Sequence, residues 1–404
     1  MNEKGSNHQL LKQNNYNLIK KYIYRNSPIS RVEVAQQLGL TTATITGMVT
    51  PLLNAGLLRE TVAAASEAKG AGRPRMMLEF VPEVYYICGV DTGPYQTNYI
   101  LTDMRGNTVA FRHTDQPLGE YHSTLERFAR EIPEFLSRSG IPREKILGVG
   151  ICLPGMIDGS ADKIYDIFRE DWTGHSLSAE LGERLGLKVE VENNVRARAI
   201  AAELFDRIVK AEPFAYFFVS FGVACQMIID GKVLYGQSAA AGEIGHTVVQ
   251  RNGPVCPTCG NRGCLEALTG ERAILQQCRD IMDTDTPTAL KELCRDSRKL
   301  TMEQVLAAQK MGDMAVGQVI EDAIEYLGIA LANTINLISP RAVVLEGRIL
   351  STPKNQAQML RIVEQYMFNI HAGMIDFSFL PYDPNRGARA AAAVVVKEFL
   401  GTSK

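Results

Sequence analysis

A cluster of three cysteines and one histidine is the strongest chemical signal in the sequence. In the stretch CPTCGNRGC two residues separate Cys256 from Cys259, Cys264 follows five residues later, and His246 precedes all three. Three thiolates and one imidazole make a closed tetrahedral site for Zn²⁺, which is structural because no position remains for water. The alternative is a set of three reduced cysteines in a glycine-rich loop. We expect a structural Zn²⁺.

The rest of the composition describes an ordinary globular chain. Its 404 residues favour two or three domains. There is no apolar run of membrane-spanning length, and the polar start has no signal-peptide core, so we expect a cytoplasmic protein without a membrane partner. In that compartment a disulfide framework is not expected. The five remaining cysteines should be buried small hydrophobic residues: Cys88, Cys152, Cys225, Cys278 and Cys294.

The start of the chain predicts a basic helical module. Residues 1–80 contain ten Lys or Arg against five Glu and no Asp, a net +5 that leaves −7 for the remainder and indicates a polyanion partner at one end. Apolar residues at helical spacing predict a helix over 14–26, which Pro28 ends. Ser30 and Glu33 form a capping box for a short second helix, and Gly39 supplies the turn that follows it.

A third helix opening at Thr41 completes a helix-turn-helix. One face is apolar, whereas the opposite face is small and polar and can approach a major groove closely. Residues 55–58 then read as a strand entry, so 1–60 are predicted to be a winged helix-turn-helix that binds a double-stranded DNA operator. The alternative is a three-helix interaction module. The expected DNA contacts in this module are Arg31, Thr41, Thr42, Thr44 and Thr46.

Residues 61–82 are predicted to be a linker or wing. The segment is rich in Ala and then reads Gly-Arg-Pro-Arg, an extended basic composition that suits an arm in a narrow minor groove. Arg73 and Arg75 would be its DNA contacts. The alternative is a simple hinge.

The long remainder of the chain predicts a layered α/β domain with two lobes. Apolar strands such as YYICGVD and KILGVGICLPG alternate with helical patterns, and a second cycle runs from PFAYFFVSFG to RAVVLEG. The first lobe is expected over 83–193, joined by 383–404, and the second over 194–382.

The motifs of this part resemble the ROK family of repressors and sugar kinases. They are CGVDTG, GVGICLPGMIDG, VENNVRARAIAAELF, GEIGHTVV, CPTCGNRGCLEAL, LGIALANTINLISPRAVVLEG and GARAAAAVV, spread over 86–399. The helix-turn-helix and the Gly-Arg-Pro segment resemble the repressor branch. The resemblance implies a two-lobed actin- and hexokinase-like, ribonuclease H-like fold, with the zinc site and the dimerisation surface on the second lobe.

The resemblance also implies roles for particular residues. His246, Cys256, Cys259 and Cys264 take the zinc-ligand positions, although the family commonly has one residue between the first two cysteines and here Pro257 and Thr258 intervene. Glu243 and Glu266, each near a metal ligand, would be held toward one place and accept hydrogen bonds from sugar hydroxyls. The alternative for either carboxylate is a supporting bond to a zinc ligand. The other expected sugar-binding residues are Pro154, Gly155, Asn193, Asn194 and His246.

Several kinase features of the family are missing from this sequence. The kinases use the Asp of an E-N-D motif to take the proton from the attacking hydroxyl, whereas this chain has Glu192-Asn193-Asn194, and an amide cannot accept that proton. The glycine-rich phosphate loop is replaced by Ser220–Gln226, where Phe221 and Gln226 are expected to obstruct a nucleotide. Pro94-Tyr95-Gln96 replaces small residues in the first phosphate turn, and Glu346 stands where LGG is expected.

We therefore expect a homodimeric or tetrameric repressor, not an enzyme, whose DNA affinity changes when a sugar or sugar derivative closes the cleft between the lobes. Two alternatives remain. One is a ROK sugar kinase with an attached DNA-binding domain, and the other is a repressor that is controlled by a protein partner.

Overall fold

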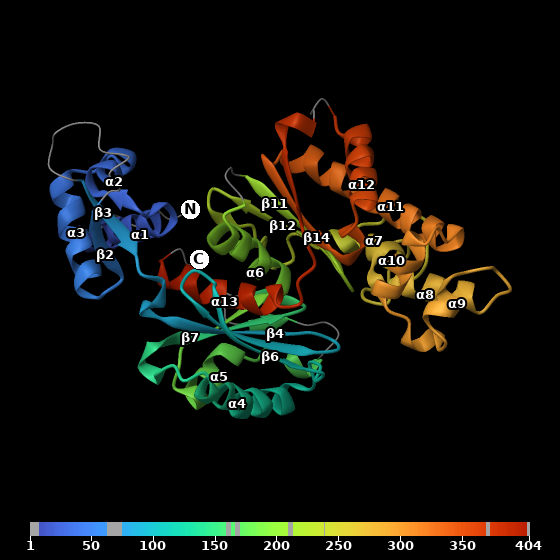
Figure 1. Ribbon diagram of the computed structural model, residues 1–404, viewed down its shortest axis with the longest axis horizontal. Helices are drawn as coiled ribbons and strands as arrows, with labels where there is room; N and C mark the ends of the chain where they lie inside the picture. Colours follow the sequence, from blue (N-terminus) through green and yellow to red (C-terminus); the bar gives the residue numbers. More distant parts are fainter. Residues whose placement is uncertain are drawn as a thin grey trace. The chain divides into compact units, whose positions relative to one another are not determined.

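The computed structural model divides the chain into two compact units (Figure 1). It describes residues 8–62, 75–158, 163–165, 170–208, 213–237, 239–368 and 372–401. The first unit contains Met1–Tyr165, Asp171–Phe205 and Asn385–Lys404, and the second contains Asp166–Glu170 and Asp206–Pro384. The N-terminal module thus belongs to the same unit as the first lobe. The second unit begins its long segment at Asp206, whereas the sequence placed the start of the second lobe at residue 194.

The first part of the chain forms a winged helix. Its three helices pack beside a three-stranded antiparallel sheet in the order β1-β3-β2, and β3 lies within the segment assigned above to a linker or wing. The helices are α1 (His8–Asn26), α2 (Arg31–Leu38) and α3 (Thr42–Asn54), and the strands are β1 (Ile29–Ser30), β2 (Leu58–Val62) and β3 (Met76–Phe80).

Local sequence explains the ends of these helices. Ser30 and Glu33 form the expected capping box at the start of α2, and Gly39 ends that helix in the left-handed conformation with φ of 64°. The Thr41 side chain caps α3. The apolar face of α3 is buried through Ile45, Val49 and Leu52, and the opposite face is exposed, as the sequence predicted.

The body of the first unit is a five-stranded sheet in the order β10-β7-β4-β5-β6. Helices α4 and α5 cover one face, and α6 and α13 cover the other (Figure 1). A two-stranded sheet of β8 and β9 follows β7. The strands are β4 (Tyr86–Thr92), β5 (Thr97–Asp103), β6 (Thr108–Thr114), β7 (Ile146–Leu153), β8 (Met156–Asp158), β9 (Lys163–Tyr165) and β10 (Val189–Asn193), and the helices are α4 (Tyr121–Arg138), α5 (Leu177–Leu185), α6 (Asn194–Ala201) and α13 (Arg386–Phe399).

Two glycines let α13 lie directly on this sheet. A Cβ added to Gly89 would lie 2.0 Å from the carbonyl oxygen of Ala388, and one added to Gly150 would lie 1.9 Å from that of Ala391. Neither position has space for a side chain, so the C-terminal helix packs against the backbone of β4 and β7.

The second unit contains a second five-stranded sheet, in the order β13-β12-β11-β14-β15. Its core includes apolar side chains of the central strands and of the long helix α11. The strands are β11 (Phe214–Val219), β12 (Val223–Ile229), β13 (Lys232–Val233), β14 (Ala342–Gly347) and β15 (Asp376–Leu380), and the helices are α7 (Leu265–Thr269), α8 (Glu271–Met282), α9 (Leu290–Leu293), α10 (Met302–Lys310), α11 (Met314–Ile338) and α12 (Pro353–Tyr366).

The two sheets with their helices confirm the predicted α/β class. The five scattered cysteines are free and buried, as expected. Burial raises the pKa of the Cys88 and Cys225 thiols to about 12, so both behave as small apolar groups.

Candidate metal and effector-binding sites

Short turns of the second unit bring the four predicted metal ligands together. His246 ends the 3₁₀ turn Ile244–His246, and Cys264 is the residue before α7. Isolated β-bridges join Val248 to Cys264 and Val255 to Arg262. Gly263 makes the crossing possible: its φ is +76°, and an added Cβ would lie 1.6 Å from the Gln250 carbonyl oxygen.

The geometry of the four side chains fits a tetrahedral metal ion. The ligand atoms of His246, Cys256, Cys259 and Cys264 all lie within 4.8 Å of one another. The Cys259 and Cys264 sulfurs are 3.6 Å apart, and Cys256 Sγ is 3.8 Å from His246 Nδ1. Tetrahedral zinc with bonds of about 2.3 Å would separate two thiolate ligands by about 3.8 Å. The cluster can therefore hold one metal ion with four protein ligands.

The carboxylate of Glu266 is tied to the cysteine loop. Glu266 lies in the first turn of α7, and the Thr258 hydroxyl, between the first two cysteines, donates a hydrogen bond to its Oε1. Its Oε2 lies 3.0 Å from where a Cβ on Gly222 would be. From the sequence, Thr258 was only an extra residue in the cysteine spacing, and this bond was not predicted. A hydroxyl between two metal ligands, close in sequence to a candidate carboxylate, was the available signal.

Glu243 occupies the start of the turn that ends at His246. Its backbone carbonyl accepts a hydrogen bond from the His246 N–H at 3.1 Å, and its side chain is half-buried. Both interpretations of this residue, as a sugar ligand or as a support for the metal site, remain predictions.

In the first unit the structure joins two of the predicted sugar-binding segments. Asn193 Nδ2 donates to the carbonyl oxygen of Gly155 at 2.9 Å, while its Oδ1 caps α6 by accepting from the N–H groups of Val195 and Arg196. Pro154 and Asn194 are half-buried beside these residues in the chain. The Asn193 side chain therefore fixes the loop after β7 to the start of α6.

A buried ion pair supports this junction and was missed from the sequence. Arg196 Nε lies 2.8 Å from Glu192 Oε1, both side chains are 3% exposed, and Arg196 also donates to the Ile157 carbonyl oxygen at 2.7 Å. Each of the two buried charges compensates the other, and separating them would leave a charge without a partner inside the protein. The pair therefore holds the Glu192–Asn193 corner in place.

Asp91, the last residue but one of β4, faces a basic side chain of the same unit. Arg198 Nη2 lies 3.9 Å from Asp91 Oδ2. Burial raises the pKa of the Asp91 carboxyl, and the charge of Arg198 acts in the opposite direction. The space for any side chain here is small, because a Cβ on Gly387 would lie 1.8 Å from Asp91 Oδ2.

We refer to residues 220–222 and Arg348–Leu350 together as the carboxyl edge of the second sheet. Strands β11 and β14 are parallel with Val219 opposite Gly347, so both loops leave the sheet at the same edge. Arg348 Nη1 donates to both carboxylate oxygens of Glu271 at 3.0 and 2.8 Å. The guanidinium also lies 4.0 Å from the centre of the Tyr382 ring.

Two further carboxylates at this edge have partners within the second unit. Glu303 Oε1 lies 3.0 Å from Arg348 Nε. Glu346 is 1% exposed and accepts a hydrogen bond from the Tyr216 hydroxyl. Arg348 therefore pairs with two carboxylates, and Glu346 points into the protein.

One sequence argument about this edge was wrong. Gln226 was expected to obstruct a nucleotide beside the loop, but it lies within β12, is 3% exposed, and donates to the Leu234 carbonyl oxygen at 2.8 Å. Phe221 is half-buried in the tight turn between β11 and β12, so the steric part of the argument depends on Phe221.

Six of the seven predicted DNA contacts lie within the described residues, and each is exposed or half-buried. Thr41, Thr42 and Thr46 are exposed and Thr44 is half-buried at the start of α3. Arg31 forms an ion pair with Glu60 of β2, and the Arg75 side chain is 76% exposed. Arg73 lies outside the described residues.

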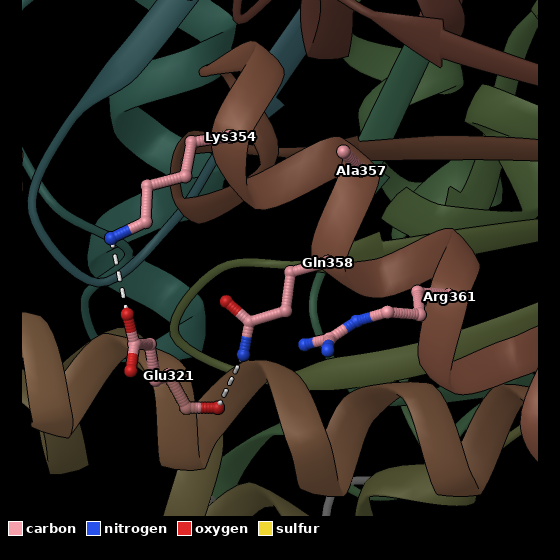
Figure 2. A pocket seen from close by; sticks show the side chains of 5 residues that line it. All are labelled: Glu321, Lys354, Ala357, Gln358 and Arg361. Atoms are coloured by element: carbon pink, nitrogen blue, oxygen red, sulfur yellow. Dashed lines mark hydrogen bonds and ion pairs between the residues drawn. The ribbon is translucent and has the colours of Figure 1, made fainter.

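A shallow hollow between α11 and α12 contains none of the predicted site residues (Figure 2). Its Lys354 is already paired with Glu321 at 3.1 Å, and Gln358 donates to the Glu321 carbonyl oxygen. Among the helices in the described part of the chain, none has the length and apolar character that crossing a membrane requires.

Comparison with known proteins places these sites in one family. Residues 87–398 match the model of the ROK family. The chain belongs to the ROK family. It is 28% identical to the xylose repressor of Bacillus subtilis (strain 168) over 393 residues. This match covers 96% of this chain and 97% of the repressor. It is 27% identical over 352 residues to the DNA-binding transcriptional dual regulator NagC of Escherichia coli (strain K12), with 86% and 84% covered.

Solved structures of ROK proteins agree with this assignment. A ROK family transcriptional regulator described as a homolog of the E. coli MLC protein superposes with a TM-score of 0.82 and 25% identity over 96% of both chains. A ROK family glucokinase from Streptomyces griseus, in complex with glucose and AMPPNP, gives a TM-score of 0.66 at 19% identity and covers 76% of this chain and 98% of the kinase. The kinase shares the fold, and the regulator also spans the winged helix.

Proposed function

We propose that this ROK protein is a sugar-responsive transcriptional repressor that binds duplex DNA and binds a sugar without phosphorylating it. The observation that carries the proposal is the exposed, small and polar face of α3 on a winged helix that precedes a ROK domain. Relatives named as repressors, including the B. subtilis xylose repressor, match nearly the whole chain. Such a helix face fits a major groove because no long side chain keeps the backbone away from the bases.

The proposed DNA contacts divide into two kinds. Thr41, Thr42, Thr44 and Thr46 are the groove contacts, while Arg31 and the basic residues Arg73 and Arg75 neutralise phosphates or enter the minor groove. The ion pair of Arg31 with Glu60 fixes that guanidinium beside the wing. A homodimer or tetramer would place two such modules on the half-sites of one operator.

The proposed metal is a structural Zn²⁺ held by His246 and the three clustered cysteines. Sulfur-rich tetrahedral sites with separations like those described here favour zinc over hard cations. The ion would fix the turn after Glu243 and the start of α7, and so orient Glu243 and Glu266 for sugar hydroxyls. His246, Pro154, Gly155, Asn193 and Asn194 are the other proposed sugar-site residues.

The absence of phosphoryl transfer is also proposed, and two features support it. Asn194 stands at the position of the kinase base, and an amide cannot take a proton from a hydroxyl. At the carboxyl edge of the second sheet, Arg348 is engaged by Glu271, Glu303 and Tyr382, so its charge is already paired within the protein.

The proposal can be tested with the full-length, zinc-loaded protein. A random pool of duplexes is selected by the protein at low salt, and the retained sequence is assayed by fluorescence anisotropy with and without a panel of sugars. Xylose, N-acetylglucosamine and their phosphates are tested first, because two relatives are named xylose repressor and N-acetylglucosamine repressor. We expect one sugar to change the Kd of the duplex and to raise the melting temperature. Selection of no duplex would contradict the proposal.

A sugar kinase with an attached DNA-binding module is a second candidate, because the glucokinase of S. griseus shares the fold. A coupled ADP-release assay over the same sugars decides between the two, since only a kinase releases ADP in proportion to sugar consumed. If a duplex is selected but no sugar shifts the melting temperature, a repressor controlled by a protein partner is favoured instead.

A further inference from the structure

Within the first unit, one continuous helical segment leads from the proposed sugar-binding corner to the winged helix. Asn193, whose amide is bonded to the Gly155 carbonyl, caps α6. Seven residues of α6, from Val195 to Ala201, are buried, and a turn of π-helix, Ala202–Asp206, continues the helix without a break. A single buried helical segment thus joins the Asn193 corner to the π-helical turn.

The π-helical turn ends against the winged helix through a charged contact. The Glu203 carboxylate forms an ion pair with Arg25 in the last turn of α1. The Glu203 side chain is only 9% exposed, whereas that of Arg25 is 34% exposed. A carboxylate buried to this degree depends strongly on its cationic partner, so the relative position of Glu203 and α1 is fixed by more than packing.

A second contact beside the first fixes the orientation of the winged helix. Arg105, in the turn after β5, stacks 4.2 Å from the centre of the Tyr24 ring and 5.3 Å from that of Phe80, and donates to Ser27 Oγ at 2.9 Å. The Tyr24 hydroxyl donates to the Met104 carbonyl oxygen at 2.7 Å. Side chains from α1, from the loop after it and from β3 thus all meet one turn of the first lobe.

The same turn touches the π-helical turn directly. A Cβ on Gly106 would lie 2.5 Å from Phe205 Cδ2, so the Phe205 ring packs on the bare backbone of Gly106. Arg389 of α13 donates to the Gly106 carbonyl oxygen at 2.8 Å and lies over the Phe205 ring. Glu203 and Phe205 therefore reach the winged helix by two neighbouring routes, one direct and one through residues 104–106.

We propose that α6 and its π-helical turn transmit sugar binding at Asn193 to the DNA-binding module, with Glu203 and Arg105 as the positioning residues. The proposal rests on the function proposed above. In this account the sugar stabilises one position of the α6 segment, and the Glu203–Arg25 pair converts that position into one orientation of α1. Neither Glu203 nor Arg105 is a proposed ligand of sugar or DNA, so each can alter the coupling while both binding surfaces remain intact.

The test compares the native protein with E203Q, which removes the buried charge and keeps the size of the side chain. The duplex selected by the native protein is titrated by anisotropy with and without the sugar that changes its Kd. Allosteric proteins typically show a change of roughly 5- to 150-fold. We expect the change in E203Q to fall to less than about two-fold, while calorimetry still detects sugar binding. E126Q is the matched control, because Glu126 is an exposed acid of the same lobe that pairs with Arg184, and it should respond like the native protein.

Charge reversal keeps the proposal testable if E203Q folds poorly. R25E and E203R should each lose the response, and the double variant R25E/E203R should recover at least half of it on a logarithmic scale. A full response in folded E203Q, or a double variant no better than the single ones, would overturn the proposal. Loss of duplex binding by E203Q without sugar would also overturn it, because the pair would then build the DNA-binding module itself. If the native protein selects no duplex or responds to no sugar, the proposed function fails instead.

Discussion

Two loop regions of the second unit have opposite chemistry. In the cysteine cluster, four side chains converge on one point, and Glu266 beside them keeps an oxygen next to the bare backbone of Gly222. At the carboxyl edge of the second sheet, Arg348 binds Glu271, Glu303 and Tyr382. The comparison shows that one region gathers side chains around a point where an ion could bind, whereas in the other the charges of the protein already pair with each other.

The largest effect is expected at the cysteine cluster. C259S removes one of four ligands, and structural zinc sites contribute roughly 10–16 kcal/mol of binding free energy in isolated zinc-finger peptides. We expect less than one zinc per chain by mass spectrometry of metals and a melting temperature lower by roughly 10 °C. C294S, at a buried cysteine of the same unit, should keep its zinc. A full complement of zinc in C259S would contradict the assignment of this ligand.

A smaller but substantial loss is expected at the carboxyl edge. R348A leaves Glu271, whose side chain is 3% exposed, buried without its cation. Breaking a buried pair from one side costs about 3–5 kcal/mol, so the free energy of unfolding in urea should fall by about that amount. R298A, at an exposed pair with Asp296, should leave the free energy of unfolding nearly unchanged. Equal effects of the two variants would show that the edge is not a buried network.

The cost of R348A should also depend on pH. Burial raises the pKa of the Glu271 carboxyl, and Arg348 acts against that rise. Without Arg348 the folded-state pKa rises further above its unfolded value, so the folded protein binds a proton more readily than the unfolded chain. The destabilisation should therefore be fully present near pH 8 and decrease toward pH 5 as Glu271 is protonated. A gap between R348A and the native protein that does not change with pH would contradict this account.

A still smaller effect is expected at Thr258, which lies in the loop of the cysteine cluster. T258V removes the hydroxyl that fixes Glu266 and should lower sugar affinity by roughly three- to ten-fold, because hydrogen bonds to charged groups contribute about 1.5–3 kcal/mol and this one is partly exposed. The zinc content should not change. T258S keeps the hydroxyl and should bind like the native protein. A sugar affinity in T258V equal to that of the native protein would show that Glu266 needs no such support.

The last prediction is that two substitutions toward the kinase sequence produce no kinase activity. The double variant N194D/E346G introduces a candidate base and the glycine expected in the LGG motif, but Arg348 and Glu271 remain paired at the carboxyl edge. We expect no sugar-dependent release of ADP in a coupled assay in which an active ROK glucokinase gives a signal. Turnover by the double variant would mean that the edge does not exclude the nucleotide.

Local patterns predicted the elements and the grouping of the four candidate metal ligands, because both depend on residues close in sequence. The capping box of Ser30 and Glu33 and the left-handed Gly39 are single-turn features, and the structure has both. The ligands His246 to Cys264 lie within one short segment, so their spacing already limited the geometry.

Contacts between distant segments could not be predicted in the same way. The Arg25–Glu203 pair and the packing of Phe205 on Gly106 depend on how α1, β5 and α6 meet, and nothing local indicates them. Gln226 was misplaced for the same reason: the type of residue was read correctly, but the direction of its side chain depends on the register of β12 with β13.

One titration tests whether the protein responds to a sugar without phosphorylating it. The zinc-loaded protein on its selected duplex is titrated with the responsive sugar in the presence of Mg²⁺ and ATP, while anisotropy and ADP are followed in the same sample. The account predicts that the duplex affinity changes with sugar concentration and that ADP stays at the level of a sugar-free blank. Accumulation of ADP in step with added sugar would contradict it.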